Sequence, residues 1–85
     1  MNDKRILVVD DETDLLEMVK SIFTRAGFTQ ILTASSGEAA LKMCEEQEPD
    51  MMIINSVFFY SWFQFAHVPY LLWKQARLVL TQSHR

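Results

Sequence analysis

Two adjacent aspartates, Asp10 and Asp11, directly follow a short aliphatic run, and Asn55 follows another one further along the chain. If both runs are strands of a doubly wound parallel sheet, their carboxyl ends meet where ligands usually bind. Carboxylate and amide oxygens form a hard, oxygen-only donor set, which suits Mg²⁺ completed by water and a phosphate group. We therefore predict a metal site formed by Asp10, Asp11 and Asn55.

A simpler interpretation of the acidic residues stays open. Acidic side chains ahead of a helix are also what the positive end of the helix dipole selects. The aliphatic strand before Asp10, and a matching strand that ends at Asn55, favour the interpretation as a site.

The elements that must position these residues follow a regular order. Residues 6–9, 31–34 and 51–54 are short apolar runs, typical of strands buried on both faces of a parallel sheet. A helix after residue 12 is predicted by an apolar stripe of Leu15, Val19, Ile22 and Ala26, widened by Leu16 and Phe23, with Gly27 as its C-terminal cap. The strand–helix–strand–helix–strand order implies parallel, right-handed crossovers.

A second helix is predicted between the runs at 31–34 and 51–54. Ser35 and Glu38 have the spacing of a capping box, which would start this helix, and Pro49 would end it. Cys44 would face inward as a small core residue.

Three segments together resemble the receiver domain of two-component response regulators: Arg-Ile-Leu-Val-Val-Asp-Asp-Glu at 5–12, Ser-Gly-Glu-Ala-Ala-Leu at 36–41, and Pro-Asp-Met-Met-Ile-Ile at 49–54. The resemblance implies a flavodoxin-like α/β fold with strand order 2-1-3. It also implies a cytoplasmic module that a sensor histidine kinase phosphorylates on an aspartate at the end of the third strand. Asp11 would match the direct Mg²⁺ ligand, and Asp10 the ligand that acts mainly through water. Apart from self-dephosphorylation, no enzyme activity is implied.

The chain departs from this family at the reacting position. Asn55 stands where the phosphorylated aspartate is expected, and an amide is a poor nucleophile with no negative charge. The family's switching Ser/Thr cannot be placed, because Thr81 and Ser83 lack a matching context. Lys74 does not match the family's phosphate-binding lysine. We therefore expect an incomplete receiver that is not phosphorylated, or a phosphorylation-independent interaction module.

Composition divides the chain near residue 55. The 85 residues carry a net charge of −3, without the basic stripe of a nucleic-acid-binding protein. Residues 1–55 hold all eleven acidic and five basic residues, a net of −6, whereas residues 56–85 hold three basic residues and eight of the ten aromatics. The single cysteine fits a reducing compartment. We interpret 1–55 as the receiver-like part and 56–85 as a divergent apolar, basic tail.

The tail invites several hypotheses. Helical stripes are predicted over residues 58–66 and 72–80, with a frayed end at 81–85. The tail would fold over an open edge of the third strand, or that edge and the tail would support self-association.

The 23 uncharged residues at 51–73 are long enough to span a membrane, but polar residues interrupt them, so a span is disfavoured. His67 and His84 have no partner at metal-ligand spacing. The abrupt change suggests a shifted reading frame or a grafted terminus.

Overall fold

The structure is a computed structural model, which describes residues 3–55 and 77–81. Four strands and two helices occur in this order: β1 (Arg5–Val9), α1 (Thr13–Arg25), β2 (Gln30–Ala34), α2 (Gly37–Gln47), β3 (Met51–Asn55) and β4 (Arg77–Thr81). All neighbouring strands are parallel, and their order in the sheet is β2-β1-β3-β4. The predicted α/β fold, with three parallel strands in the order 2-1-3 and two helices, is confirmed.

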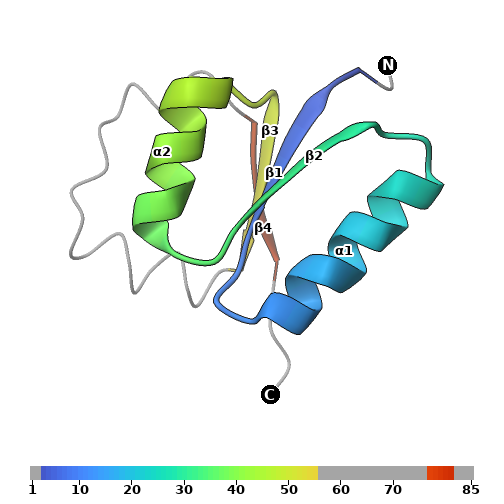
Figure 1. The fold of residues 1–85 in the computed structure, drawn as a ribbon, viewed down its shortest axis with the longest axis horizontal. Coiled ribbons are helices and arrows are strands. Elements are labelled where there is room, and N and C mark those ends of the chain that lie inside the picture. The colour runs from blue at the N-terminus through green and yellow to red at the C-terminus, as the bar shows by residue number, and fades with distance from the viewer. Residues whose placement is uncertain (1–2, 56–76, 82–85) are drawn as a thin grey trace.

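The two helices cover opposite faces of the sheet (Figure 1). Leu7 and Val9 of β1 pack in a cluster with Cys44 of α2, whereas Ile6 and Val8 pack in a second cluster with Leu16 of α1. Successive side chains of a strand point to opposite faces, so a strand between two helical layers must be apolar at every position. The unbroken aliphatic run of β1 meets this requirement.

Helix α1 buries only one side of the predicted apolar stripe. Leu16 is buried and Val19 and Phe23 pack beside it, but Ile22 is 56% exposed. The prediction that Ile22 faces inward is therefore wrong, because the helix is rotated toward the side of Leu16 and Phe23. Gly27 follows the helix with a φ of 101°, the left-handed conformation expected of a glycine at a helix C-terminus.

Helix α2 begins one residue later than predicted. Ser36, not Ser35, is the N-cap, and its hydroxyl oxygen accepts a hydrogen bond of 3.1 Å from the backbone N–H of Ala39. The capping-box assignment to Ser35 and Glu38 is therefore wrong by one position. The helix ends at Gln47, before the buried Pro49, which has no N–H to continue it.

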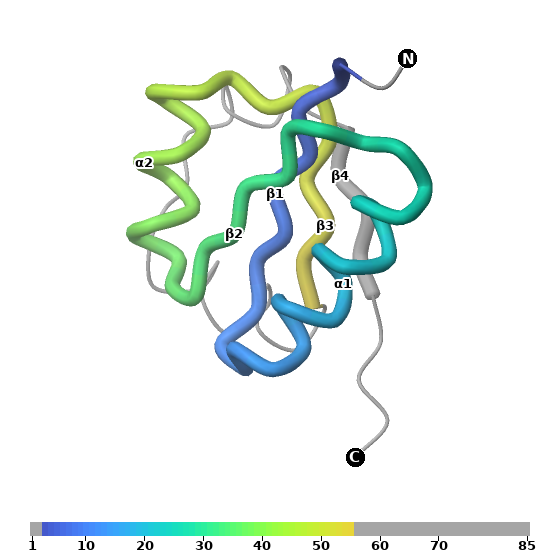
Figure 2. Tube along the Cα trace, turned by 45° about the vertical axis from the view of Figure 1, so that its right-hand side comes forward, coloured from blue at the N-terminus to red at the C-terminus, as the bar shows by residue number. Residues whose placement is uncertain are grey.

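Strand β4 corrects two predictions about the tail. Residues 77–81 form a strand rather than a helix or a frayed end, and they pair with the whole length of β3 from Met51↔Arg77 to Asn55↔Thr81. The edge of β3 is therefore not open, and β4 stands at that end of the four-stranded order (Figure 2). The other predicted tail helix, at 58–66, and both histidines lie outside the described residues.

One arginine, Arg5, links several elements at the end of the sheet where the strands begin. The Arg5 guanidinium donates hydrogen bonds from Nε to Gln30 Oε1 (3.0 Å) and from Nη1 to the carbonyl oxygen of Gln47 (2.6 Å). The backbone N–H of Arg5 donates to Asp50 Oδ2 (2.9 Å), and the N–H of Asp50 donates to the Arg5 carbonyl oxygen (2.8 Å). Helix α2 has no basic residue in its last turn, so Arg5 supplies the cation that its C-terminal dipole favours.

The uncharged segment at 51–73, for which a membrane span is disfavoured, begins in the sheet. Its first five residues, Met51–Asn55, are strand β3, and in the described part of the chain neither helix has the length and apolarity needed to cross a bilayer.

Candidate functional site

The candidate site lies at the other end of the sheet from Arg5, where the strands end. Asp10 directly follows β1 and continues the ladder, because its backbone N–H donates to the carbonyl oxygen of Ala34 (3.2 Å). The Asp10 side chain is only 9% exposed, and its Oδ1 accepts a hydrogen bond from the N–H of Glu12 (3.0 Å). Asp11 is exposed. The loop thus turns one carboxylate inward and leaves the next one open to solvent.

The hydrogen bond of Asp10 bears on the helix-dipole interpretation. Helix α1 begins after Glu12, whose side chain makes no capping hydrogen bond, and the acid in its first turn is Asp14. Asp10 instead accepts from the residue at the N-cap position and so fixes the turn between β1 and α1. Complementarity to the dipole accounts for Asp14, whereas the buried position of Asp10 depends on the end of the strand.

Asn55 is the last residue of β3, and its side chain is 8% exposed. The register pairs Val9 with Ile54, so Asp10 and Asn55 are the next residues along two adjacent strands. Ile53 packs in the cluster beneath α1, as does Val8. By the alternation of side chains along a strand, Asn55 and Asp10 belong to that same face.

The fourth strand adds a position that the sequence analysis did not place. Thr81 ends β4 and stands in register with Asn55. A signal was present in the sequence, because Leu78, Val79 and Leu80 form an aliphatic run that ends in a hydroxyl residue, as the run of β3 ends in an amide. The helical spacing from Leu72 to Leu80 masked it. The backbone thus aligns an acid, an amide and a hydroxyl residue at the ends of three neighbouring strands.

The oxygen donors of the three predicted residues suit Mg²⁺, but they carry little negative charge. Asp10, Asp11 and Asn55 offer only oxygen, which hard divalent cations prefer. Within residues 3–55 and 77–81, no three His, Cys, Asp or Glu side chains gather closely enough to hold a metal ion. The donor set therefore fits a weakly held Mg²⁺ that keeps most of its water.

Cys44 lies in the core beneath the sheet, at 4% exposure. Burial raises the pKa of this thiol, and the negative charge of Glu45 raises it further by a smaller amount. A buried thiol with a raised pKa is a poor nucleophile, which agrees with its predicted role in packing.

In a doubly wound parallel sheet, ligands bind outside the carboxyl ends of the strands, and Asp10 and Asn55 lie at the ends of two adjacent central strands. Residues 6–57 match the family model of the response regulator receiver domain, so the chain belongs to this family. The three segments that carry the sequence resemblance, between residues 5 and 54, cover nearly the same part of the chain.

Curated relatives support the same assignment. Over 53 residues, 62% of this chain, it is 40% identical to the alkaline phosphatase synthesis transcriptional regulatory protein PhoP of Bacillus subtilis. It is 38% identical over 50 residues, 59% of this chain, to the transcriptional regulatory protein KdpE of Mycobacterium tuberculosis, and 35% identical over 52 residues, 61% of this chain, to the chemotaxis protein CheY of Thermotoga maritima. The matched segments span 22% of PhoP, 22% of KdpE and 43% of CheY.

Proposed function

We propose that this chain is a receiver module of two-component phosphorelay signalling that contacts a sensor histidine kinase in the cytoplasm without accepting its phosphoryl group. The observation that carries the proposal is the buried amide of Asn55 at the end of β3, on the strand next to the one that Asp10 follows. In the family, this is the position of the aspartate that becomes phosphorylated.

The chemical reason lies in the side chain itself. Phosphoryl transfer to this position needs a carboxylate oxygen that attacks phosphorus and keeps the new bond as an acyl phosphate. The oxygen of Asn55 belongs to a neutral amide, which lacks the charge and the nucleophilicity for that attack. The module would therefore respond to its partners through binding rather than through its own modification.

Magnesium would play a reduced part in such a module. By resemblance to the family, Asp11 would hold the ion directly, Asp10 would act mainly through water, and the carbonyl oxygen of Asn55 would supply the third protein contact. When bound, Mg²⁺ would neutralise the acidic edge and attract a phosphate oxygen. With two carboxylates instead of three, we expect weak binding that competes poorly with hydration.

The proposal can be tested by mass. The protein is incubated with acetyl phosphate and Mg²⁺, and the intact chain is weighed at once under mildly acidic conditions. We expect no gain of a phosphoryl group. A labile gain of one such group that maps to the end of β3 would refute the proposal. Phosphorylation of a related receiver that has aspartate at this position, run in parallel, shows that the reagent is active.

A second candidate function is a self-associating interaction module, and the position of β4 favours it. Within the described residues β4 pairs with β3 alone, and its central residues Leu78, Val79 and Leu80 carry no charge or proline. Charged residues and prolines commonly protect the edge strands of sheets, because an unprotected edge can pair with another chain. The sequence analysis predicted self-association through the edge of β3. Because β4 occupies that edge, self-association would instead use the edge of β4.

Sedimentation and hydrogen exchange distinguish this candidate. If β4 edges pair between copies, the sedimentation coefficient should rise with protein concentration, and the amides of residues 77–81 should exchange more slowly in the concentrated sample. A monomer at all concentrations, with unchanged exchange at 77–81, would exclude it. Exchange in α2 provides the internal reference, because this helix lies far from the edge.

A further inference from the structure

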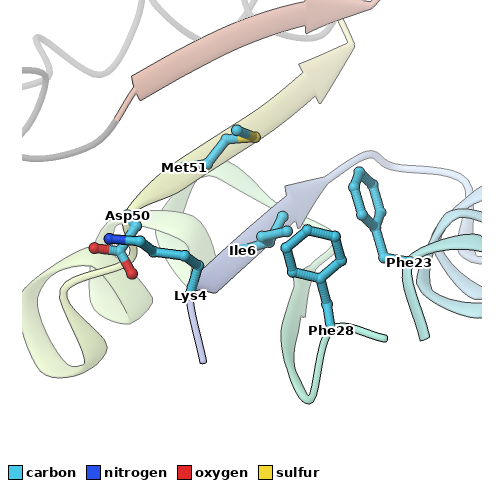
Figure 3. Close-up of a pocket in the computed structure, with 6 residues that line it drawn as sticks. All are labelled: Lys4, Ile6, Phe23, Phe28, Asp50 and Met51. Atoms are coloured by element: carbon cyan, nitrogen blue, oxygen red, sulfur yellow. The ribbon is translucent and has the colours of Figure 1, made fainter. Parts of the chain in front are cut away.

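A second concave site lies at the end of the sheet where the strands begin, away from Asp10 and Asn55. Its cavity has a volume of about 340 Å³, and Ile6, Phe23, Phe28 and Met51 form its apolar wall. Figure 3 shows these side chains together with Lys4 and Asp50, which complete the lining. The volume falls at the small end of the range of ligand-binding pockets, roughly 300–1,000 Å³.

The apolar wall is held in place by packing on the α1 face. Phe23 at the end of α1 and Phe28 in the following loop meet edge to face, with ring centroids 5.6 Å apart and an interplanar angle of 76°. The N–H of Phe28 donates to the carbonyl oxygen of Phe23 (3.1 Å), so the turn at Gly27 fixes both rings. A third aromatic or branched apolar group could extend this pair, because aromatic rings favour such edge contacts.

The charged part of the lining comes from the two strand entrances. Lys4 precedes β1, Asp50 precedes β3, and both side chains are exposed. The mutual backbone contacts of Arg5 and Asp50 hold these entrances together, since Arg5 N–H donates to Asp50 Oδ2 and Asp50 N–H donates to the Arg5 carbonyl oxygen. An ammonium and a carboxylate therefore stand beside one apolar cavity.

From this juxtaposition we infer that the cavity binds a free amino acid with an apolar side chain. The ligand carboxylate would meet the ammonium of Lys4, the ligand ammonium would meet the carboxylate of Asp50, and the side chain would enter between Phe28, Phe23 and Met51. Charge complementarity favours the zwitterion, because it can meet both Lys4 and Asp50, whereas a ligand with one charge meets only one of them. The solvent exposure of both charged side chains implies weak affinity.

The experiment is a ¹H–¹⁵N NMR titration with L-phenylalanine as the probe, compared with 3-phenylpropionate, phenethylamine and glycine. We expect saturable shifts at Phe28, Asp50 and Met51 with L-phenylalanine and unchanged amides in α2. Removal of either ligand charge should weaken binding about two- to fivefold, the range for an exposed ion pair. Glycine, which lacks the side chain, should cause no saturable shift at these amides.

Matched variants assign the contacts. Lys4→Gln and Asp50→Asn should each weaken binding of L-phenylalanine by the same two- to fivefold, and Lys42→Gln on α2 should leave it unchanged. Asparagine at position 50 keeps an oxygen that can accept from the Arg5 N–H, and unshifted α2 amides would show that each variant is folded. Absence of saturable shifts, equal binding of phenethylamine or 3-phenylpropionate, or indifference to both variants would overturn the inference. Equal binding of the singly charged ligands would assign the cavity to general apolar contact, as with a partner's side chain.

Discussion

The substitution Asn55→Asp restores a carboxylate to the end of β3, and its consequences can be worked out from the position of that residue. The Asn55 side chain is 8% exposed, and Asp10, on the neighbouring strand, is 9% exposed. Without metal, the new charge is costly because it is buried and lies near a like charge. Two charges separated by about the 4.8 Å spacing of adjacent strands interact by about 3 kcal/mol at an effective dielectric constant of 20, and access of solvent to this end of the sheet reduces this. We expect a loss of about 1–2 kcal/mol in the free energy of unfolding.

Magnesium should offset this loss of stability. A third carboxylate turns the repulsive cluster into a stronger cation site, and we expect Mg²⁺ to bind about 10- to 100-fold more tightly to Asn55→Asp than to the wild type, roughly 1.4–2.7 kcal/mol. At a Mg²⁺ concentration a hundred times the new Kd, binding adds about 2.7 kcal/mol to stability. The variant should thus be less stable than the wild type without Mg²⁺ and regain most or all of that loss with it.

The assay is urea unfolding of both proteins across a Mg²⁺ series, at constant ionic strength. Gln47→Glu makes the same amide-to-carboxylate change at the opposite end of the sheet, where the carbonyl oxygen of Gln47 accepts from Arg5. This control variant should show no added dependence on Mg²⁺. If Mg²⁺ stabilises Asn55→Asp no more than it stabilises Gln47→Glu, then Asp10, Asp11 and position 55 do not form one cation site.

Three further changes test other parts of the fold. Arg5→Met removes two guanidinium hydrogen bonds that join β1 to β2 and α2; we expect about 2 kcal/mol less stability by urea unfolding, and a loss under 0.5 kcal/mol would contradict this linking role. Ser36→Ala should cost about 1 kcal/mol and Ser35→Ala much less, and equal losses would refute the assigned N-cap. Because burial raises the pKa of Cys44, its thiolate is favoured in the unfolded chain. The stability that the neutral thiol contributes is fully present below the ordinary thiol pKa and declines as pH rises from about 8.5 through the raised folded value. Cys44→Ala should remove this alkaline component, and an unchanged pH profile would count against it.

The sheet was predictable where one physical requirement dominated the sequence. The runs at 6–9 and 51–54 are apolar at every position because helices cover both faces, so no other strand assignment competes with them. The turn at Gly27 was predictable for a similar reason, since its φ of 101° strongly favours glycine. The common edge of Asp10 and Asn55 then followed from the parallel order of the strands.

Predictions failed where two interpretations of the same residues were nearly equal. Leu15 and Leu16 both fit an apolar stripe on α1, and only the docked helix shows that the Leu16 side faces the sheet while Ile22 lies 56% exposed. Ser35 and Ser36 are both suitable caps, and their choice depends on where β2 releases the chain. The residues of β4 matched a helical period, but pairing with β3 decided their structure, because a parallel strand is stabilised by a neighbour distant in sequence rather than by its own pattern.

The two ends of the sheet differ in their contacts. Hydrogen bonds that stabilise the fold lie where the strands begin, and the proposed signalling site lies where they end. At the entrance of the strands, Arg5 donates hydrogen bonds to oxygens of Gln30, Gln47 and Asp50, and these part-buried or exposed contacts join β1 to its neighbours. At the exit, the buried residues Asp10 and Asn55 each follow one member of the registered pair Val9↔Ile54, and we propose that they belong to a cation site. A substitution at position 55 should therefore alter cation and phosphoryl chemistry while the Arg5 contacts remain intact. Such a division would let this fold lose its phosphoacceptor without losing the sheet that positions it.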